Sequence, residues 1–283
     1  MSLTPSEFDF LATMLVRESA IVLEPGKEYL IESRLTGLMR REGLETYAEL
    51  VGELSSPGAG RLRDLVVDAM TTNETSFFRD THPWATLRDE IIPSLVEARR
   101  SARRLTFWCA ASSSGQEPYS LAMLLHEHFA DVVAEWTVSI VGTDLSPTVI
   151  ANASAGRFSQ LEVDRGLPAA MLARHFRRDG IEWRISDDIR SMVRFEQGNL
   201  ADDRCIQRTA LVDGVLMRNV MIYFDPAVRA RILRGVHARL RSDGFLLLGS
   251  GENAVLDDGC FERERRDRTI FFRPARQLST TAS

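Results

Sequence analysis

Cysteine and lysine are the scarcest chemically informative residues of this sequence. The 283 residues include three cysteines, Cys109, Cys205 and Cys260, and their odd number and wide spacing fit neither a disulfide framework nor a cysteine metal site. Lys27 is the one lysine among 35 basic residues, a usage typical of GC-rich bacterial coding sequences. We therefore expect a bacterial protein of a reducing compartment that holds no metal ion.

Long apolar runs are absent as well. No stretch approaches the roughly 18 consecutive apolar residues of a membrane-spanning helix, and residues 1–10 lack the basic and then apolar order of a secretory signal. The resulting expectation is a cytoplasmic location without membrane insertion. A content of 44% hydrophobic and 27% charged residues with a net charge of −5 predicts a globular chain with one sizeable core. This composition provides no strongly basic surface for nucleic acid.

The amino-terminal part of the chain is acidic and helical in pattern. Residues 1–80 carry 8 basic and 14 acidic side chains. Thr4, Pro5 and Glu7 form the sequence pattern of a capped helix start. Apolar residues recur at helical spacing in three further segments, 27–41, 47–54 and 62–70. We therefore expect a helical bundle over residues 1–70.

The remainder of the chain alternates short apolar runs with amphipathic stretches, the pattern of a mostly parallel sheet covered by helices. The expected strands are 105–109, 137–142, 192–196, 211–217 and 245–249. The expected helices, each opened by a proline, are 118–130, 147–155 and 226–240. Residues 71–102 are assigned to a linker and the first helices of this α/β domain, which is expected to extend over 103–276.

The stretch 158–194 departs from this alternation and is predicted to be a small inserted β subdomain. A short helix over 168–174 precedes an alternating pattern from 181 to 185, with a turn at 178–180 that suits a hairpin. Residues 268–272 are expected to close the large sheet as an edge strand, and 277–283 to form a disordered tail.

Small and acidic residues follow the first two strands. Residues 110–115 are small enough to let a ligand approach the backbone, and Glu117 follows at a helix start with free amides. A tight turn with Glu117 as an acid favoured by the helix dipole explains the same pattern. Asp144 ends the second strand, where acids of nucleotide-binding sheets accept hydrogen bonds from ribose, although a helix cap is the alternative. Together the two acids favour a ligand with a ribose and a cationic amino acid end.

The linker segment TTNETSFFRD, residues 71–80, is unusually polar and aromatic for a connection. Phe77 and Phe78 are expected to fill the seam between the bundle and the sheet. The polar members of the segment are instead candidates for a site: Asn73, Thr75 and Arg79.

A second polar segment follows the fourth strand, at residues 217–225. Arg218 and Asn219 are expected at the carboxyl edge of the sheet, where ligands of open α/β sheets bind. Tyr223 is either a member of the same site or a half-buried core tyrosine.

These motifs occur in the same order in one family. The chain resembles the chemotaxis receptor methyltransferases, the CheR family, which methylate glutamate side chains with S-adenosylmethionine. The matching segments are TTNETSFFRD from Thr71, CAASSSGQEPYSLAMLL from Cys109, VGTDLSPTVIANASAGRF from Val141, GNL from Gly198, RNVMIYFD from Arg218 and LLLGSGEN from Leu246. The resemblance implies a Rossmann-like doubly wound methyltransferase domain with a small β insertion, preceded by an all-α substrate-recognition domain.

The resemblance also implies roles for the matched residues. In the family the second acid of an EEPYS motif holds the amino acid end of the cofactor, which implies Glu117, and the acid after the second strand binds ribose, which implies Asp144. Gln116 replaces the first acid of that motif. The other implied cofactor contacts are Asn73, Thr75, Arg79, Asn199, Leu200, Arg218 and Asn219. Arg79 and Tyr223 are further assigned orienting roles in catalysis.

The implied substrate is the cytoplasmic helical domain of a transmembrane chemoreceptor, whose glutamates become methyl esters. Four basic residues concentrate positive charge on one segment of the acidic bundle: Lys27, Arg34, Arg40 and Arg41. We expect this segment to bind the receptor substrate, and a solvated helix face is the alternative. The short turn of the predicted hairpin indicates that no receptor pentapeptide tether binds there. A monomer is the family expectation.

Two rival functions remain at this point. A module that senses the cofactor or scaffolds a complex without turnover is disfavoured by the intact Arg79 and Asp144. A nucleic-acid or small-molecule methyltransferase is disfavoured because the sequence has neither a strongly basic groove nor an NPPY-type motif.

Overall fold

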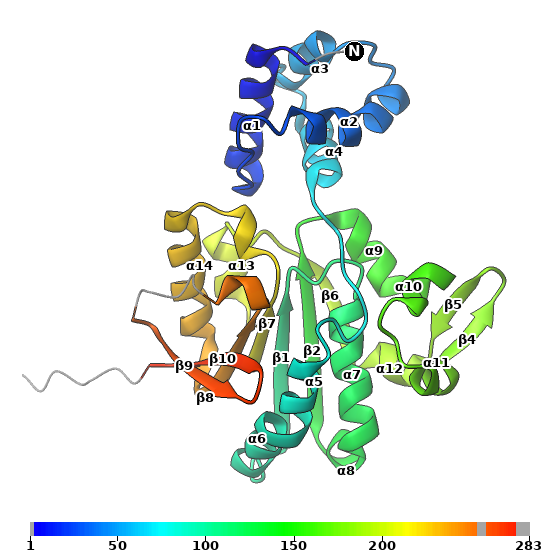
Figure 1. The fold of residues 1–283 in the computed structure, drawn as a ribbon, viewed down its shortest axis with the longest axis vertical. Helices are drawn as coiled ribbons and strands as arrows, with labels where there is room; N and C mark the ends of the chain where they lie inside the picture. Colours follow the sequence, from blue (N-terminus) through cyan, green and yellow to red (C-terminus); the bar gives the residue numbers. More distant parts are fainter. Residues whose placement is uncertain (1–2, 254–258, 276–283) are drawn as a thin grey trace, which may run out of the picture.

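The computed structural model describes residues 3–253 and 259–275. They form a helical bundle, a large sheet covered by helices, and a small second sheet, with the bundle at one end of the molecule (Figure 1). The predicted tail over 277–283 lies outside the described residues.

All helices predicted for the amino-terminal part are present and pack on a core of their own. Their bounds are α1 Pro5–Ser19, α2 Glu28–Glu42, α3 Tyr47–Leu54 and α4 Gly60–Met70. Thr4 caps α1 as predicted, because its hydroxyl accepts from the N–H of Glu7, whose carboxylate accepts from the N–H of Thr4. Leu11, Leu15 and Leu35 are fully buried between these helices.

The large sheet is mostly parallel. Its strands are β1 Arg104–Ala110, β2 Thr137–Asp144, β6 Val193–Gln197, β7 Val212–Met217, β8 Leu240–Leu248, β9 Phe261–Arg266 and β10 Thr269–Pro274. Among the described residues they lie in the order β6-β2-β1-β7-β8-β10-β9, with the first five parallel to their neighbours and β10 antiparallel to both of its own. This order confirms the predicted Rossmann-like α/β class.

Helices cover both faces of this sheet. In β1, Phe107 and Cys109 face one side and Trp108 and Ala110 the other, and all four are inaccessible to solvent. The Phe107 side packs against α6 and α7, and the Trp108 side against α13 and α14. The helical segments are α5 His82–Thr86, the π-helical η1 Leu87–Ile91, α6 Ile92–Ala98, α7 Gln116–His128, α8 Ala130–Glu135, α9 Pro147–Ala155, α13 Asp203–Arg208, the 3-10 turns η2 Met221–Tyr223 and η3 Ser250–Glu252, and α14 Pro226–Arg239.

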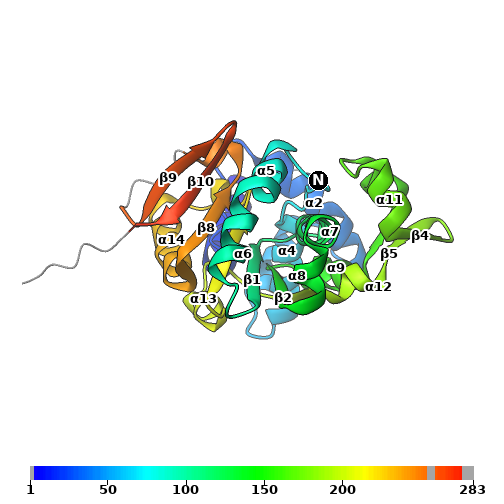
Figure 2. The same ribbon diagram turned by 90° about the horizontal axis from the view of Figure 1, so that it is seen from below.

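The predicted inserted β subdomain is present, and its hairpin is confirmed. β4 and β5 pair antiparallel around Gly180, and β3, which the sequence did not predict, adds a third strand in the order β3-β5-β4. Figures 1 and 2 show this subdomain at the opposite end of the large sheet from β9 and β10. Its elements are β3 Arg157–Phe158, α10 Gln160–Asp164, α11 Ala169–His175, β4 Phe176–Asp179, β5 Glu182–Ile185 and α12 Asp187–Ser191.

The strand predicted over 268–272 is present, but its predicted place at the edge of the sheet is wrong. The corresponding strand β10 lies between β8 and β9, and β9 forms the edge. The sequence of β9, FERERR, carries no alternating apolar pattern because most of its side chains are exposed or half-exposed at the rim. Charged side chains are common on edge strands, where they discourage pairing with other chains.

Candidate functional site

A pocket lies at the carboxyl ends of β1, β2 and β7, beside the helical bundle. β1 has β2 on one side and β7 on the other, so the strand order reverses there, and doubly wound sheets bind ligands outside such a switch point. The space between the lining atoms is about 970 Å³, open solvent at the mouth included. All residues predicted for catalysis and cofactor binding line this pocket: Asn73, Thr75, Arg79, Glu117, Asp144, Asn199, Leu200, Arg218, Asn219 and Tyr223.

Three residues beside the pocket have left-handed backbone conformations. Ala111 and Ser113, in the loop after β1, have φ angles of 57° and 48°, and Asn219, after β7, has a φ of 61°. Residues other than glycine rarely adopt this region, and such strain concentrates at functional sites. The Ser113 hydroxyl donates to the carbonyl of Asn73 at 3.0 Å, which joins the loop to the linker.

Asp144, at the end of β2, holds the loop that follows β1. Its carboxylate accepts from the N–H groups of Ser113 at 2.8 Å and Ser146 at 3.0 Å. Burial raises the pKa of Asp144, although these backbone hydrogen bonds act to lower it. An ionised carboxylate has about four acceptor positions, so these two contacts leave capacity for a ligand. The alternative prediction of a helix cap is wrong for Asp144, because the cap of α9 is Ser146, whose hydroxyl accepts from the N–H of Val149 at 3.1 Å.

Arg218 forms a buried link between two acids. Its side chain is 2% exposed and donates to Glu117 Oε2 at 3.1 Å and to Asp80 Oδ2 at 2.6 Å. A third hydrogen bond, of 3.0 Å, reaches the carbonyl of Arg79. Burial raises the pKa of Glu117 despite the opposing charge and hydrogen bond of Arg218. Because the group of three carries two negative charges and one positive, it favours a cationic ligand.

Arg79 approaches the pocket from the linker. Its guanidinium donates to the carbonyl of Glu74 at 3.2 Å, and within the described part of the chain it forms no ion pair. A guanidinium has five N–H donors, so Arg79 retains capacity to bind an anion.

The two phenylalanines of the linker do not fill the predicted seam with the bundle. Phe77 packs edge-to-face on Phe158 and Phe176 of the inserted subdomain, with ring centroids 5.0 and 5.6 Å apart, and Phe78 packs on Trp84 at 5.3 Å. The expectation is wrong because the linker runs along the large sheet after it leaves the bundle. Both rings therefore belong to the hydrophobic core on the face of the sheet that carries Phe107.

Asn199 and Tyr223 form the side of the pocket that faces α1. The Asn199 amide donates to the carbonyl of Glu18 at 3.0 Å and accepts from the N–H of Ala201 at 2.8 Å. The carbonyl of Tyr223 accepts from the N–H of Val22 at 3.0 Å. The bundle is thus bonded directly to the pocket wall, and the side chain of Asn199 is already largely occupied.

The four basic residues predicted to bind substrate have different surroundings. Lys27 pairs with Glu24 at 2.9 Å, and Arg34 donates to the Met70 carbonyl and to the Thr72 hydroxyl. Arg34 therefore orders the linker at the pocket. The remaining two, Arg40 and Arg41, are exposed in the last turn of α2.

Within residues 3–253 and 259–275, no helix is both long and apolar enough to cross a bilayer.

Two family models match the chain in tandem. Residues 6–71 match the all-alpha domain of CheR methyltransferases, and residues 73–270 match the SAM binding domain of CheR methyltransferases. The chain belongs to the CheR methyltransferase family.

Curated members of this family are similar over most of their length. "Chemotaxis protein methyltransferase 1" of Pseudomonas aeruginosa is 40% identical over 255 residues, which cover 89% of this chain and 92% of the relative. "Chemotaxis protein methyltransferase Cher2" of Pseudomonas putida is 38% identical over the same shares. "Chemotaxis protein methyltransferase" of Vibrio parahaemolyticus is 33% identical, over 96% of this chain and 98% of the relative.

The pocket of this CheR family member has the polar groups that S-adenosylmethionine needs. Three buried polar atoms of its lining, Ser112 Oγ, Arg218 Nε and Asn219 Oδ1, have no hydrogen-bond partner within the described residues. Buried polar atoms are costly when unpaired, which favours a polar ligand beside them. The acids Glu117 and Asp144 suit the ammonium and ribose of the cofactor.

Glu252 supports the pocket of this CheR family member from behind Asn219, and its role was not predicted from the sequence. It is fully buried, and its carboxylate accepts from the N–H groups of Asn219 at 2.6 Å, Met221 at 2.7 Å and Gly249 at 2.8 Å. It therefore holds the loop after β7 in its left-handed turn. Glu252 lies in the matched segment LLLGSGEN, four residues after the apolar run 245–248, and no role followed from that position alone.

Proposed function

We propose that this CheR family member transfers a methyl group from S-adenosylmethionine to glutamate side chains of chemoreceptors and produces glutamyl methyl esters. The observation that carries the proposal is the convergence of Glu117, Asp144 and Arg79 on one pocket, where the guanidinium of Arg79 keeps N–H donors beyond its bond to the Glu74 carbonyl. The names of the curated relatives support a role in chemotaxis.

The cofactor supplies an electrophilic methyl group on a sulfonium. In the proposal Glu117 holds its ammonium and Asp144 accepts from its ribose hydroxyls. Ser112 and Asn219 provide the buried polar atoms that otherwise lack partners. Glu252 acts through Asn219, whose backbone it positions.

A glutamate substrate with an ordinary pKa of about 4.3 is ionised at neutral pH, so the reaction needs no general base. The protein has to desolvate the carboxylate and aim it, and such positioning can remove roughly 7–11 kcal/mol of the barrier. Arg79 is assigned to orient the carboxylate through two parallel N–H donors. Tyr223, on the side of the pocket that faces α1, is also assigned an orienting role.

The partner in this proposal is the cytoplasmic helical domain of a transmembrane chemoreceptor, and the enzyme is a cytoplasmic monomer without a nucleic-acid substrate.

Within the inserted subdomain only Gly180 and Ile181 separate β4 from β5. With so short a turn, we expect methylation of receptors that lack a carboxyl-terminal pentapeptide. Calorimetry should detect no binding of the isolated pentapeptide at micromolar concentration, and a dissociation constant near ~1 μM, about −8 kcal/mol, would contradict this.

Radiolabelled S-adenosylmethionine tests the proposed function directly. The purified chain is incubated with a receptor cytoplasmic fragment, with the same fragment carrying alanine at its methylated glutamates, and with bulk RNA. Base-labile label on the first fragment alone is the expected result. Label on RNA, or tight binding of S-adenosylhomocysteine without transfer to any substrate, would contradict the proposal in favour of one of its rivals.

The pH dependence of cofactor binding should reveal the role of Glu117. A cationic ligand binds the ionised carboxylate, and burial raises the pKa of this group in the unliganded protein. Affinity for S-adenosylhomocysteine should therefore fall on acidification at a pH above the ordinary glutamate range of about 4.3. Calorimetric titrations between pH 5 and 8 measure this, and Glu117→Gln should bind more weakly and show a smaller pH dependence, the remainder coming from Asp144, whose pKa burial also raises. If Glu117→Gln showed the same pH profile as the wild type, Glu117 would not be a cofactor contact.

Charge reversal on α2 tests the docking of the receptor. Because Arg34 also orders the linker, Arg40→Glu with Arg41→Glu is the cleaner change. We expect the KM for a glutamate-rich receptor fragment to rise about tenfold at low ionic strength, and its salt dependence to weaken. Arg100→Glu, at another exposed position, is the matched control. Unchanged kinetics in the double variant would mean that the receptor docks elsewhere.

A further inference from the structure

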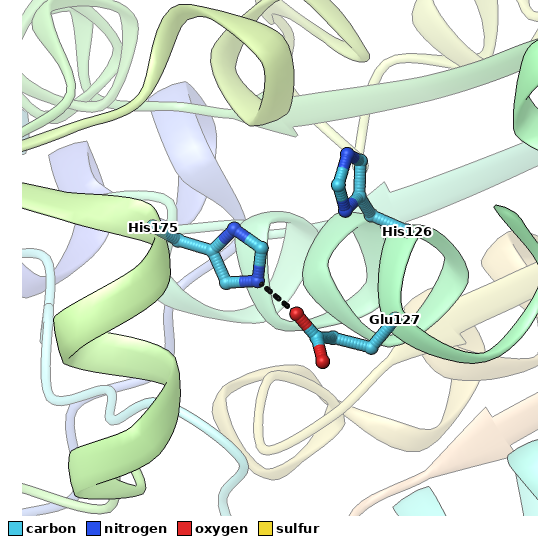
Figure 3. A group of neighbouring side chains, drawn as sticks. All are labelled: His126, Glu127 and His175. Carbon is cyan, nitrogen blue, oxygen red and sulfur yellow. Dashed lines mark hydrogen bonds and ion pairs between the residues drawn. The ribbon is translucent and has the colours of Figure 1, made fainter.

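Two histidines and a glutamate meet at the end of α7 that lies away from the pocket (Figure 3). His126 and Glu127 belong to the last turn of α7, and His175 is the last residue of α11, which continues directly into β4. One possible ligand atom from each residue lies within 4.8 Å of the other two. The cluster therefore joins the inserted subdomain to the large sheet domain.

The contacts inside this cluster are close. His175 is 5% exposed, and its Nε2 lies 2.7 Å from Glu127 Oε1. The rings of His126 and His175 meet edge-to-face with centroids 5.4 Å apart. Glu127 Oε2 faces the other way and pairs with Arg174, whose side chain is 62% exposed. One carboxylate oxygen and two imidazoles thus share a partly buried space.

The chemistry of this space suits a cation. Imidazole nitrogens and a carboxylate oxygen are common zinc ligands, and sites with two histidines and one glutamate keep a fourth position for water. The carboxyl end of the 13-residue helix α7 carries partial negative charge, which also favours a cation. The Arg174 charge opposes it, but this guanidinium is exposed, so solvent and salt screen its charge.

We propose that His126, Glu127 and His175 bind a divalent transition metal ion, with zinc as the probe, and that the ion clamps the inserted subdomain onto α7. Tetrahedral zinc with bonds of about 2.0–2.1 Å separates its ligand atoms by roughly 3.3 Å. The His175 and Glu127 atoms must therefore move apart slightly from 2.7 Å, while the His126 ring moves closer. This proposal departs from the expectation of no metal, which was based on the cysteines.

The proposed metal has no part in methyl transfer. His126 follows Glu117 by nine residues on the same helix, a separation of about 13 Å at a rise of 1.5 Å per residue. The proposed ion instead attaches the inserted subdomain to α7. The core of this subdomain includes Phe158 and Phe176, which pack on Phe77. Metal binding should therefore raise thermal stability without changing affinity for S-adenosylhomocysteine.

The test uses the full chain after removal of metal ions by a chelator and dialysis. Calorimetry should show one zinc ion per chain with a dissociation constant in the micromolar range or below, and zinc should raise the unfolding temperature. His126→Ala should weaken binding at least tenfold, whereas His128→Ala, an exposed neighbour at the same helix end, is the matched control and should leave it unchanged. Arg174→Gln should tighten binding because it removes the opposing charge.

Cobalt as a second probe distinguishes this cluster from the cysteines. Its absorption spectrum should show tetrahedral ligand-field bands and no thiolate charge-transfer band. The proposal is overturned if the wild type shows no saturable zinc binding, if both histidine variants lose it equally, or if a thiolate band appears. Should His126→Ala unfold at a lower temperature without metal, His126→Gln repeats the comparison with a side chain of more similar size.

Discussion

Replacing Arg79 with alanine should lower the turnover number about 100-fold or more, while the dissociation constant of S-adenosylhomocysteine changes less than about threefold. The physical reason is positioning, since misplacing a reacting group by about 1 Å can cost a factor of 100. The backbone carbonyl of Arg79 accepts hydrogen bonds from the guanidinium of Arg218 and the indole N–H of Trp84. Because alanine keeps this carbonyl, the substitution preserves both contacts and the local fold. Single-turnover methylation of a receptor fragment and calorimetry measure the two quantities.

Arg79→Lys is the matched control for this prediction. It retains the positive charge without the planar fork of donors, so its turnover should lie between those of wild type and Arg79→Ala. If affinity for S-adenosylhomocysteine falls as much as turnover does, Arg79 binds the cofactor and does not orient the substrate.

Arg218→Met should reduce the free energy of unfolding by about 3–5 kcal/mol. Removing one partner of a buried ion pair leaves an uncompensated charge, and here Glu117 and Asp80 both lose their cation. Urea denaturation measures the loss. Arg194→Met removes an exposed pair with Glu196 and should cost less than about 1 kcal/mol.

The cost of Arg218→Met should also depend on pH. The pKa of Glu117 is already raised by burial in the presence of Arg218, and without this cation it rises further. The folded variant then binds a proton more readily than the unfolded chain, so its stability increases as the pH falls through the raised pKa. The difference from wild type should be smaller at pH 5.5 than at pH 8. Equal costs at both pH values would show that the lost packing of Arg218, rather than its charge, causes the destabilisation.

Local sequence patterns were sufficient for most elements because their signals are local. The Thr4 capping box, the prolines that open α9 and α14, and the apolar runs of β1 and β7 all appear where they were predicted. β9 was missed because an exposed edge strand needs no apolar face. β3 was missed because two residues carry no periodicity.

The fold class, the order of the motifs and ten of the residues that line the pocket could be predicted from the sequence. Strand order places the carboxyl ends of β1, β2 and β7 together, so motifs that follow those strands had to meet. The tertiary structure alone decided how each side chain is used. Arg218 is shared between Glu117 and Asp80, Arg34 orders the linker, and Glu252 holds the Asn219 loop. These contacts join positions more than 30 residues apart, and residue type and spacing carry no information about such pairs, because long-range packing selects them.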